Sequence, residues 1–187
     1  MSNEMKRLTA PRSWPVKRKS SHWITKPSPG AHAVEDSIPV NVVLRDMLHV
    51  CRTGAEVRAV IFDKGIMVDG KTVTSAKQGI GLMDVVTLPK SGAAYRMVMD
   101  RRGKLQLVQI PQEKTAWKLC RIDDKTVLSG GKVQLNLHDG RNILVEKDGY
   151  KTGDVLKIAV PEQKVMEHYS LSKGSLALIT SGSNVGE

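Results

Sequence analysis

A series of short apolar or alternating runs fills the second half of the chain, and residues that favour turns bound each run. The runs include "AYRMVMD", "KLQLVQI", "AWKLCRI", "KVQLNLHDG", "NILV" and "DVLKIAV", and Gly-Gly, Asp-Asp and Asp-Gly pairs separate several of them. Strands of this length with turn signals between them predict a small antiparallel barrel or sandwich. We place this β domain at residues 93–170, after a linker with the sequence Pro-Lys-Ser-Gly at residues 89–92.

Upstream of the linker, the apolar spacing changes to a helical period. Apolar residues recur at i, i+3, i+4 and i+7 from Val40 to Cys51, which is the pattern of an amphipathic helix. If the helix continues to residue 52, its opposite side carries a basic stripe formed by Arg45, His49 and Arg52.

A second helix and a hairpin are predicted directly after the first helix. Thr53 and Glu56 have the spacing of a capping box, in which each side chain satisfies a free backbone N–H at the start of a helix, and Gly65 is placed to end it. The run "IMVDGKTV" then alternates apolar and polar residues around an Asp-Gly pair, which favours a tight hairpin, and "GLMDVVTL" supplies a further strand.

The first 30 residues form a basic arm with a different character. They hold seven Lys or Arg residues and one acidic residue, in a chain whose formal net charge is +10 at pH 7. Four prolines and the absence of any apolar period predict an extended, irregular segment. The prolines also argue against a mitochondrial transit peptide, because such peptides are amphipathic helices.

An extended basic segment is suited to a polyanion, because phosphates release counter-ions when cations bind them. Trp14 and Trp23 offer flat faces for unpaired bases, which favours RNA over duplex DNA. The alternative is that both rings pack back onto a neighbouring domain. The candidate phosphate contacts of the arm are Lys6, Arg7, Arg12, Lys17, Arg18, Lys19 and Lys26.

Other classes of site find little support in the sequence. Cys51 and Cys120 stand far apart without metal-ligand spacing and are interpreted as buried apolar residues. His138 and Asp139 are adjacent, so in a strand they point to opposite faces, and Asp139 already fits a turn. No glycine-rich phosphate loop is present and no apolar run approaches about 18 residues. We therefore expect no cofactor, no metal, no catalytic residue and no membrane partner.

Two short helices followed by a hairpin, within about 50 residues, resemble the S-four-type RNA-binding module found in ribosomal proteins and in RNA-modifying enzymes. The resemblance implies that the helix pair presents basic residues to folded RNA. The residues concerned are Arg45, Arg52 and Arg58, with Lys64, Lys71 and Lys77 from the adjoining turns. The local charge of this module is nearly balanced, so charge by itself does not predict binding here.

The last stretch, "SLALITSGSNVGE", resembles the opening strand and loop of a KOW element, a small nucleic-acid-binding barrel. The whole order of segments is similar to the archaeal and eukaryotic (e-type) small-subunit ribosomal protein four family. The blocks that carry this resemblance include "MKRLTAPRSW", "KPSPGAH", "VVLRDMLHVCRTGAEVRAVI", "VDGKTVT", "WKLCRI", "HDGRN" and "LITSGSNVG". Ser181 departs from the glycine usual in the terminal loop, and family members continue further to complete the barrel.

The expected fold is α+β and built from several modules. They are an extended basic arm at 1–37, an S-four-type α/β RNA-binding domain at 38–89, a central small antiparallel β domain at 93–170 and the start of a KOW (SH3-like) barrel at 171–187. The family resemblance implies a structural, non-enzymatic constituent of the small ribosomal subunit. Its expected partners are small-subunit ribosomal RNA and neighbouring ribosomal proteins, with no small-molecule substrate, in the cytoplasm. The alternatives are an RNA-modifying enzyme and a free RNA-binding regulator that carry the same module.

Overall fold

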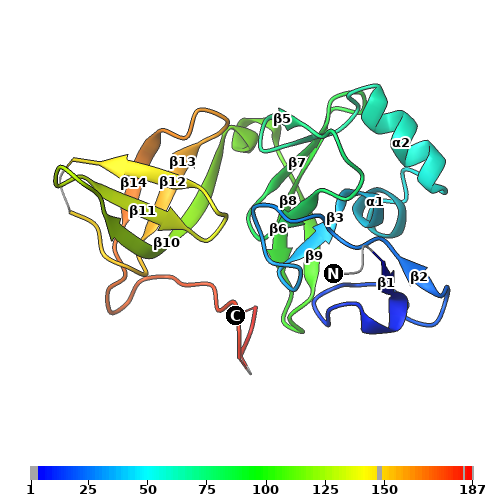
Figure 1. The fold of residues 1–187 in the computed structure, drawn as a ribbon, viewed down its shortest axis with the longest axis horizontal. Helices are drawn as coiled ribbons and strands as arrows, with labels where there is room; N and C mark the ends of the chain where they lie inside the picture. The colour runs from blue at the N-terminus through cyan, green and yellow to red at the C-terminus, as the bar shows by residue number, and fades with distance from the viewer. Residues whose placement is uncertain (1–3, 147–148, 183, 187) are drawn as a thin grey trace.

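The computed structural model describes residues 4–146, 149–182 and 184–186. Figure 1 shows two lobes side by side, with mostly β structure and few helices. The first lobe holds the arm, the helices and one group of strands, and the second lobe holds a separate sheet. Within the described ranges, no helix is long and apolar enough to cross a membrane.

The arm is folded against the first lobe. Its strands β1 (Met5–Lys6) and β2 (Trp23–Ile24) pair antiparallel, and the 3-10 helix η1 (Arg7–Thr9) follows β1. Between η1 and β2 the backbone is irregular, as expected from the prolines. The expectation of an extended arm is wrong, because Ala10, Trp14 and Ile24 are buried in the core of the lobe.

The helical region is shorter than the apolar period indicates. After β3 (Ser37–Pro39), α1 (Val40–Val42) continues into the π-helical turn η2 (Val43–Met47), where the regular helix ends. His49 follows with a φ of 53°, a left-handed conformation that stops helix propagation. The basic stripe predicted on one helix is therefore wrong, because Arg52 lies beyond the end of that helix.

Helix α2 (Gly54–Phe62) begins as predicted. The Thr53 side chain accepts a hydrogen bond from the Glu56 backbone N–H at 3.3 Å, and the Glu56 carboxylate accepts one from the Arg52 backbone N–H at 2.7 Å. The left-handed residue after the helix is Lys64, with a φ of 52°, and not the glycine that follows it.

The sheet of the first lobe has the strand order β5-β4-β7-β8-β9. Its strands are β4 (Met67–Val68), β5 (Lys71–Thr72), β7 (Val85–Leu88), β8 (Ala93–Met99) and β9 (Leu105–Ile110), and β6 (Gly79–Gly81) pairs separately with β3. The linker expected at 89–92 is a turn inside this sheet, because β7 and β8 pair across it. The sheet of the first lobe thus continues to residue 110, beyond the boundary predicted from the sequence.

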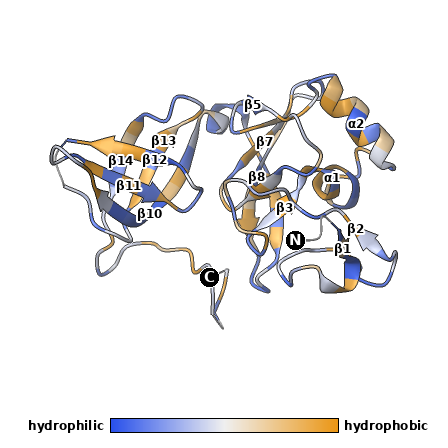
Figure 2. Ribbon diagram, in the orientation of Figure 1, coloured by the Kyte–Doolittle hydropathy of each residue, from blue (hydrophilic) through white to orange (hydrophobic). Residues whose placement is uncertain are grey.

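The second lobe is a five-stranded antiparallel sheet with the order β12-β11-β10-β13-β14. A short 3-10 segment, η3 (Gln112–Ala116), leads into it. Its strands are β10 (Trp117–Val127), β11 (Val133–Leu137), β12 (Asn142–Val145), β13 (Val155–Ala159) and β14 (Val165–Tyr169). The side chains that point inward from this sheet are apolar and form a second core. Hydrophobic and hydrophilic residues alternate along its strands (Figure 2). Of the antiparallel β domain predicted at 93–170, residues 117–169 contain this sheet, whereas residues 93–110 contain strands β8 and β9 of the first lobe.

The C-terminal stretch forms no strand among the described residues 170–182 and 184–186. Leu176 in "SLALIT" is fully exposed, so the strand predicted there is not formed. The chain returns below the two lobes (Figure 1), and Val185 approaches Gly103 in the turn between β8 and β9. Residues 183 and 187 of the predicted KOW element lie outside the described residues.

Candidate nucleic-acid interface

Arg7 holds the arm in place and is not a surface cation. Its side chain is buried, donates from Nε to the Lys17 carbonyl at 2.5 Å and from Nη1 to Ser21 Oγ at 3.3 Å, and forms an ion pair with Asp46 at 3.4 Å. These contacts tie the start of the arm to its middle and to η2. The prediction that Arg7 contacts phosphate is wrong, because its guanidinium is occupied inside the protein.

Arg18 also stabilises the folded conformation of the arm. Its guanidinium donates to the carbonyls of Leu8, Ala10 and Pro11 at distances from 2.7 to 3.1 Å. These hydrogen bonds satisfy three backbone carbonyls in a segment where the prolines prevent a regular pattern of backbone hydrogen bonds. Arg18 is therefore half-buried within the arm, and its remaining surface is what an external phosphate can reach.

The two tryptophans of the arm have opposite roles. Trp14 is 1% exposed, and its Nε1–H donates to the Ser37 carbonyl at 2.7 Å. A ring in this position cannot stack on a base, so the stacking prediction is wrong for Trp14 and the packing alternative holds. Trp23 lies on the outer face of β2 with 52% of its surface exposed, and its face is available.

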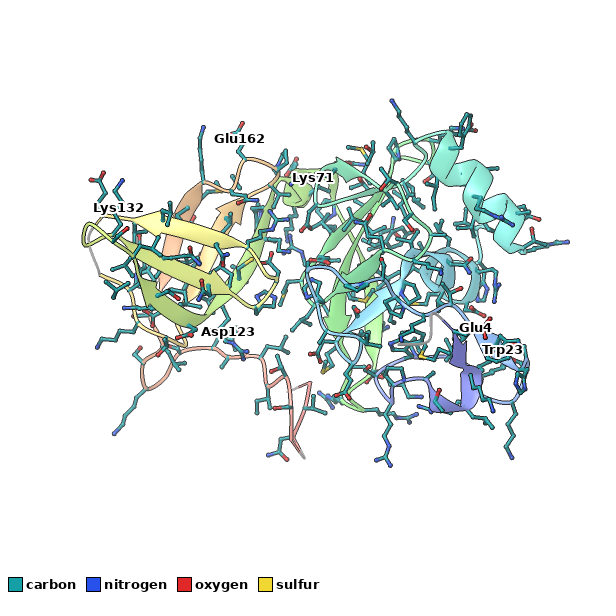
Figure 3. All side chains as sticks on the ribbon, viewed as in Figure 1. Glu4, Trp23, Lys71, Asp123, Lys132 and Glu162 are labelled. Carbon is teal, nitrogen blue, oxygen red and sulfur yellow. The ribbon has the colours of Figure 1, made fainter. Side chains whose placement is uncertain are left out.

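The other predicted cations of the arm are exposed or half-buried. The exposed ones are Lys6, Arg12, Lys17 and Lys19, while Lys26 is half-buried. Lys6 lies on β1 and pairs with Trp23 on β2, whose side chain Figure 3 shows at the edge of the first lobe. The structure thus separates the seven predicted arm cations into two that hold the arm and five that face solvent at least in part.

The predicted cations of the helical module do not form one cluster. Arg45 on η2 is partly exposed beside Asp46, and the Arg58 Nε–H donates to the Gly54 carbonyl on α2. The exposed set contains Arg52, Arg58, Lys64, Lys71 and Lys77. Lys71, on β5, lies near the second lobe and far from Trp23 (Figure 3), so only part of this set adjoins the arm.

A buried ionic cluster, which the sequence analysis missed, joins the two lobes. Lys118 on β10 is 1% exposed, and its Nζ lies 2.8 Å from Asp69, 2.7 Å from Asp84 and 2.7 Å from Asp139. Arg141 bridges Asp69 and Asp139 at 2.6 and 2.9 Å. The first two aspartates belong to the first lobe and the third to the second lobe, so the charges hold the lobes together. We name these five residues the junction cluster.

His32 from the arm region completes the charge balance of the junction cluster. Its Nε2 lies 3.0 Å from the Asp84 carboxylate. The three carboxylates of the cluster exceed its two cations by one negative charge. A protonated His32 balances that charge. Burial lowers the pKa of His32, but the hydrogen bond to Asp84 and its charge outweigh burial and raise the pKa above 6.5.

The pKa values of the other groups follow from the same contacts. Burial raises the pKa of Asp84, but the hydrogen bond from His32 and the charge of Lys118 bring it well below its usual range. Burial lowers the pKa of Lys118, and the three carboxylates more than reverse this, so Lys118 stays charged. A Cβ on Gly81 would overlap the His32 imidazole, so glycine at this position leaves the space that the imidazole needs.

The described residues include one group with metal-ligand atoms, and it does not fit a metal. Atoms of Cys120, His138 and Asp139 lie within 4.8 Å of one another. The Asp139 carboxylate already binds Lys118 and Arg141, and burial raises the pKa of the Cys120 thiol. A cation placed there would meet the positive charges of Lys118 and Arg141 and a neutral thiol.

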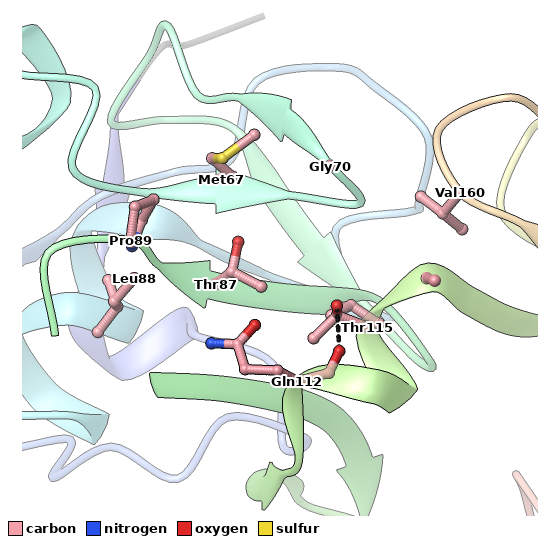
Figure 4. Close-up of a pocket in the computed structure, with 10 residues that line it drawn as sticks. Met67, Gly70, Thr87, Leu88, Pro89, Gln112, Thr115 and Val160 are labelled. Atoms are coloured by element: carbon pink, nitrogen blue, oxygen red, sulfur yellow. Dashed lines mark hydrogen bonds between the residues drawn. The ribbon is translucent and has the colours of Figure 1, made fainter. Parts of the chain in front are cut away.

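A hollow of about 380 Å³ lies where the lobes meet (Figure 4). The Thr115 hydroxyl at its edge donates to the Gln112 carbonyl at 2.6 Å. Its lining contains no titratable side chain and consists of Met67, Gly70, Val85, Thr87, Leu88, Pro89, Gln112, Thr115, Ala116 and Val160. General acid–base chemistry requires a titratable group within reach, and the residues that line this hollow supply none.

Comparison with known proteins matches nearly the whole chain. A model of the RS4NT (NUC023) domain matches residues 1–35, and a model of the ribosomal family S4e matches residues 91–165. The small ribosomal subunit protein eS4 of Methanothermobacter thermautotrophicus is 43% identical over 98% of this chain and 75% of that protein. The chain belongs to the ribosomal protein S4e family. The eS4 protein of Methanocaldococcus jannaschii is 42% identical over 98% of this chain and 78% of that protein.

A solved S4e structure has the same fold. The 30S ribosomal protein S4e of Thermoplasma acidophilum superposes with a TM-score of 0.72 and 33% sequence identity, covering 81% of this chain and 78% of that one. The resemblance predicted from the sequence blocks is therefore confirmed. The S4e family model begins at residue 91, close to the boundary predicted from the sequence, although the sheet of the first lobe continues past it.

Proposed function

We propose that this S4e protein is a structural constituent of the small ribosomal subunit in the cytoplasm and binds small-subunit ribosomal RNA. The observation that carries the proposal is its identity of about 40% with small-subunit eS4 proteins over nearly its whole length. The structure adds groups of suitable chemistry, because the folded arm carries exposed cations and one exposed tryptophan.

Electrostatic contacts with phosphates give binding that weakens steeply as salt rises. In the proposed interface, Lys6, Arg12, Lys17 and Lys19 supply contacts that do not also hold the fold. Arg45, Arg52 and Arg58 extend the interface from the helical module, which we propose is of the S-four type. Residues 171–187 are proposed as the first part of a KOW barrel, and neighbouring ribosomal proteins as the other partners.

The test is the salt dependence of binding to small-subunit ribosomal RNA. Replacing Lys6, Arg12, Lys17 and Lys19 by Gln removes up to four phosphate contacts, so the slope of log affinity against log salt should fall by roughly 3. The matched control replaces Lys114, Lys132, Lys151 and Lys173, which are exposed and lie outside the arm and the helical module. An unchanged slope in the arm variant, or an equal loss in the control, would contradict the proposed interface. Deleting the arm is a poorer test, because it removes Trp14 from the core.

Sedimentation distinguishes a ribosomal constituent from a free RNA-binding regulator, which would share every binding feature above. A constituent remains in the small-subunit peak of a sucrose gradient in high salt. A chain found only in the soluble fractions under these conditions would favour the regulator. Among the described residues we find no cluster of titratable groups that supports an RNA-modifying activity.

A further inference from the structure

Trp23 is held in a defined orientation on the surface of the arm. On β2 it pairs with Lys6 of β1, and strand alternation turns its neighbour Ile24 into the core while the indole faces outward. The His22 ring packs edge-on against the indole, with centroids 4.6 Å apart and planes at 77°. Trp14 and Trp23 are therefore different in kind, since one completes the core and the other exposes an aromatic surface.

A hollow of about 250 Å³ opens beside this indole. It is lined by Trp23, Ile24, Thr25 and Arg45, so it lies between the arm and η2 and exists only because the arm folds back. Two residues predicted separately as RNA contacts, one in the arm and one in the helical module, thus line a single site.

The polar groups of the hollow favour an anion next to a flat ring. The Arg45 side chain is 30% exposed and shares the Asp46 carboxylate with Arg7, each at 3.4 Å. One carboxylate against two guanidinium groups leaves one positive charge, and Glu4 beside Trp23 (Figure 3) and Lys6 opposite Trp23 add one charge of each sign, so the surroundings of the hollow remain positive. Thr25 Oγ1 accepts a hydrogen bond from Asn41 Nδ2 at 2.5 Å, so the Thr25 hydroxyl keeps its own hydrogen to donate.

We propose that this hollow binds one unpaired nucleotide of RNA, with its base stacked on Trp23 and its phosphate at Arg45. The inference rests on the RNA binding proposed above and assigns it a specific subsite. A base within a duplex is stacked on both faces by its neighbours, so a nucleotide from a loop, a bulge or a single strand is the ligand. Stacking on an aromatic side chain tolerates any base, and the subsite therefore selects unpaired structure over sequence.

The test compares two RNA probes with the full chain and its variants. The probes are a single-stranded decamer with 2-aminopurine at its centre and a blunt duplex of the same length, measured by anisotropy at one salt concentration. Trp23→Ala should weaken single-strand binding by about 10-fold or more and leave duplex binding within about twofold. Trp23→Phe should keep most of the affinity. The matched control is Leu8→Ala, which removes another exposed apolar side chain of the arm, 64% exposed, outside the hollow.

The outcomes separate this inference from the proposed function. If the parent chain binds RNA and Trp23→Ala binds both probes as the parent does, the subsite is refuted and the general interface stands. If the parent chain binds neither probe nor ribosomal RNA, both proposals fail. Thermal unfolding of each variant shows that the fold is unchanged, which we expect because the Trp23 ring lies outside the core. Quenching of 2-aminopurine fluorescence by the parent chain, and its loss in Trp23→Ala, reports the stacking directly.

Discussion

Replacing Lys118 by Met is the sharpest test of how the two lobes are held together. Lys118 Nζ lies within 2.8 Å of Asp69, Asp84 and Asp139, and its side chain is 1% exposed. Met has a similar length and no charge, so the substitution removes the central cation while filling most of its volume. Asp69 and Asp139 keep Arg141 as a partner, and Asp84 keeps His32.

The expected loss follows from the charge that remains. With His32 protonated, the junction cluster is neutral in the wild-type protein and carries one buried negative charge in the variant. Removing one partner from a buried ion pair costs about 3–5 kcal/mol, and we expect a loss in this range because three desolvated carboxylates then share only two cations. A folded chain of this kind has a total stability of about 5–15 kcal/mol, so the variant should be strongly destabilised.

Urea unfolding followed by tryptophan fluorescence measures this difference, and limited proteolysis at the segment between the lobes reports whether they separate first. The matched control is Lys132→Met, since Lys132 is exposed in the turn between β10 and β11 and its loss should change the free energy of unfolding by less than about 0.5 kcal/mol. A Lys118→Met loss below about 1 kcal/mol would refute the reasoning, because it would mean that the three carboxylates do not depend on Lys118.

Three further predictions concern the core and the histidine of the junction. The pKa of His32 is raised above 6.5 in the folded state, so its contribution to stability is complete below pH 6.5 and is lost as the pH rises through the folded pKa. His32→Asn should flatten this part of the plot of unfolding free energy against pH. Equal profiles for the variant and the wild-type protein would contradict the ion pair with Asp84. Trp14→Ala should cost about 3–5 kcal/mol in urea unfolding, and a loss below 1 kcal/mol would show that the arm does not contribute to the core. Gly81→Ala should displace the His32 ring and lower the thermal midpoint, whereas Gly54→Ala, where a Cβ meets nothing within 4 Å, should not; equal midpoints would refute the close contact.

Local features of the fold could be predicted from the sequence because they depend on neighbouring residues. The capping box of Thr53 and Glu56 and the strands of the second lobe are of this kind. The end of the first helix at Met47 could not be predicted, because the apolar period continues to Cys51 while the backbone turns away. Trp14 remained ambiguous, since composition cannot tell a ring in the core from one on the surface.

The junction cluster was missed because its members appear ordinary one at a time. Asp69 and Asp139 each precede a glycine and are accounted for as turn residues. Lys118 carried one usable signal: it shares a strand face with Cys120 and Ile122, at i, i+2 and i+4, and both of these are buried. A lysine on an apolar face requires a buried carboxylate, but the partners lie 34 and 49 residues away in the sequence, beyond the reach of a local pattern.

The junction cluster is completed late in the synthesis of the chain. Asp69 and Asp84 emerge from the translating ribosome before Lys118, and Arg141 comes later still. At about 5–20 residues per second, the first lobe spends several seconds with His32 as the partner of Asp84 and without Lys118 and Arg141, the cations that pair with Asp69. During that interval the contacts of Arg7 and Trp14 that hold the arm can already form, because their partners lie within residues 17–46, so the arm takes its shape before the two lobes are joined.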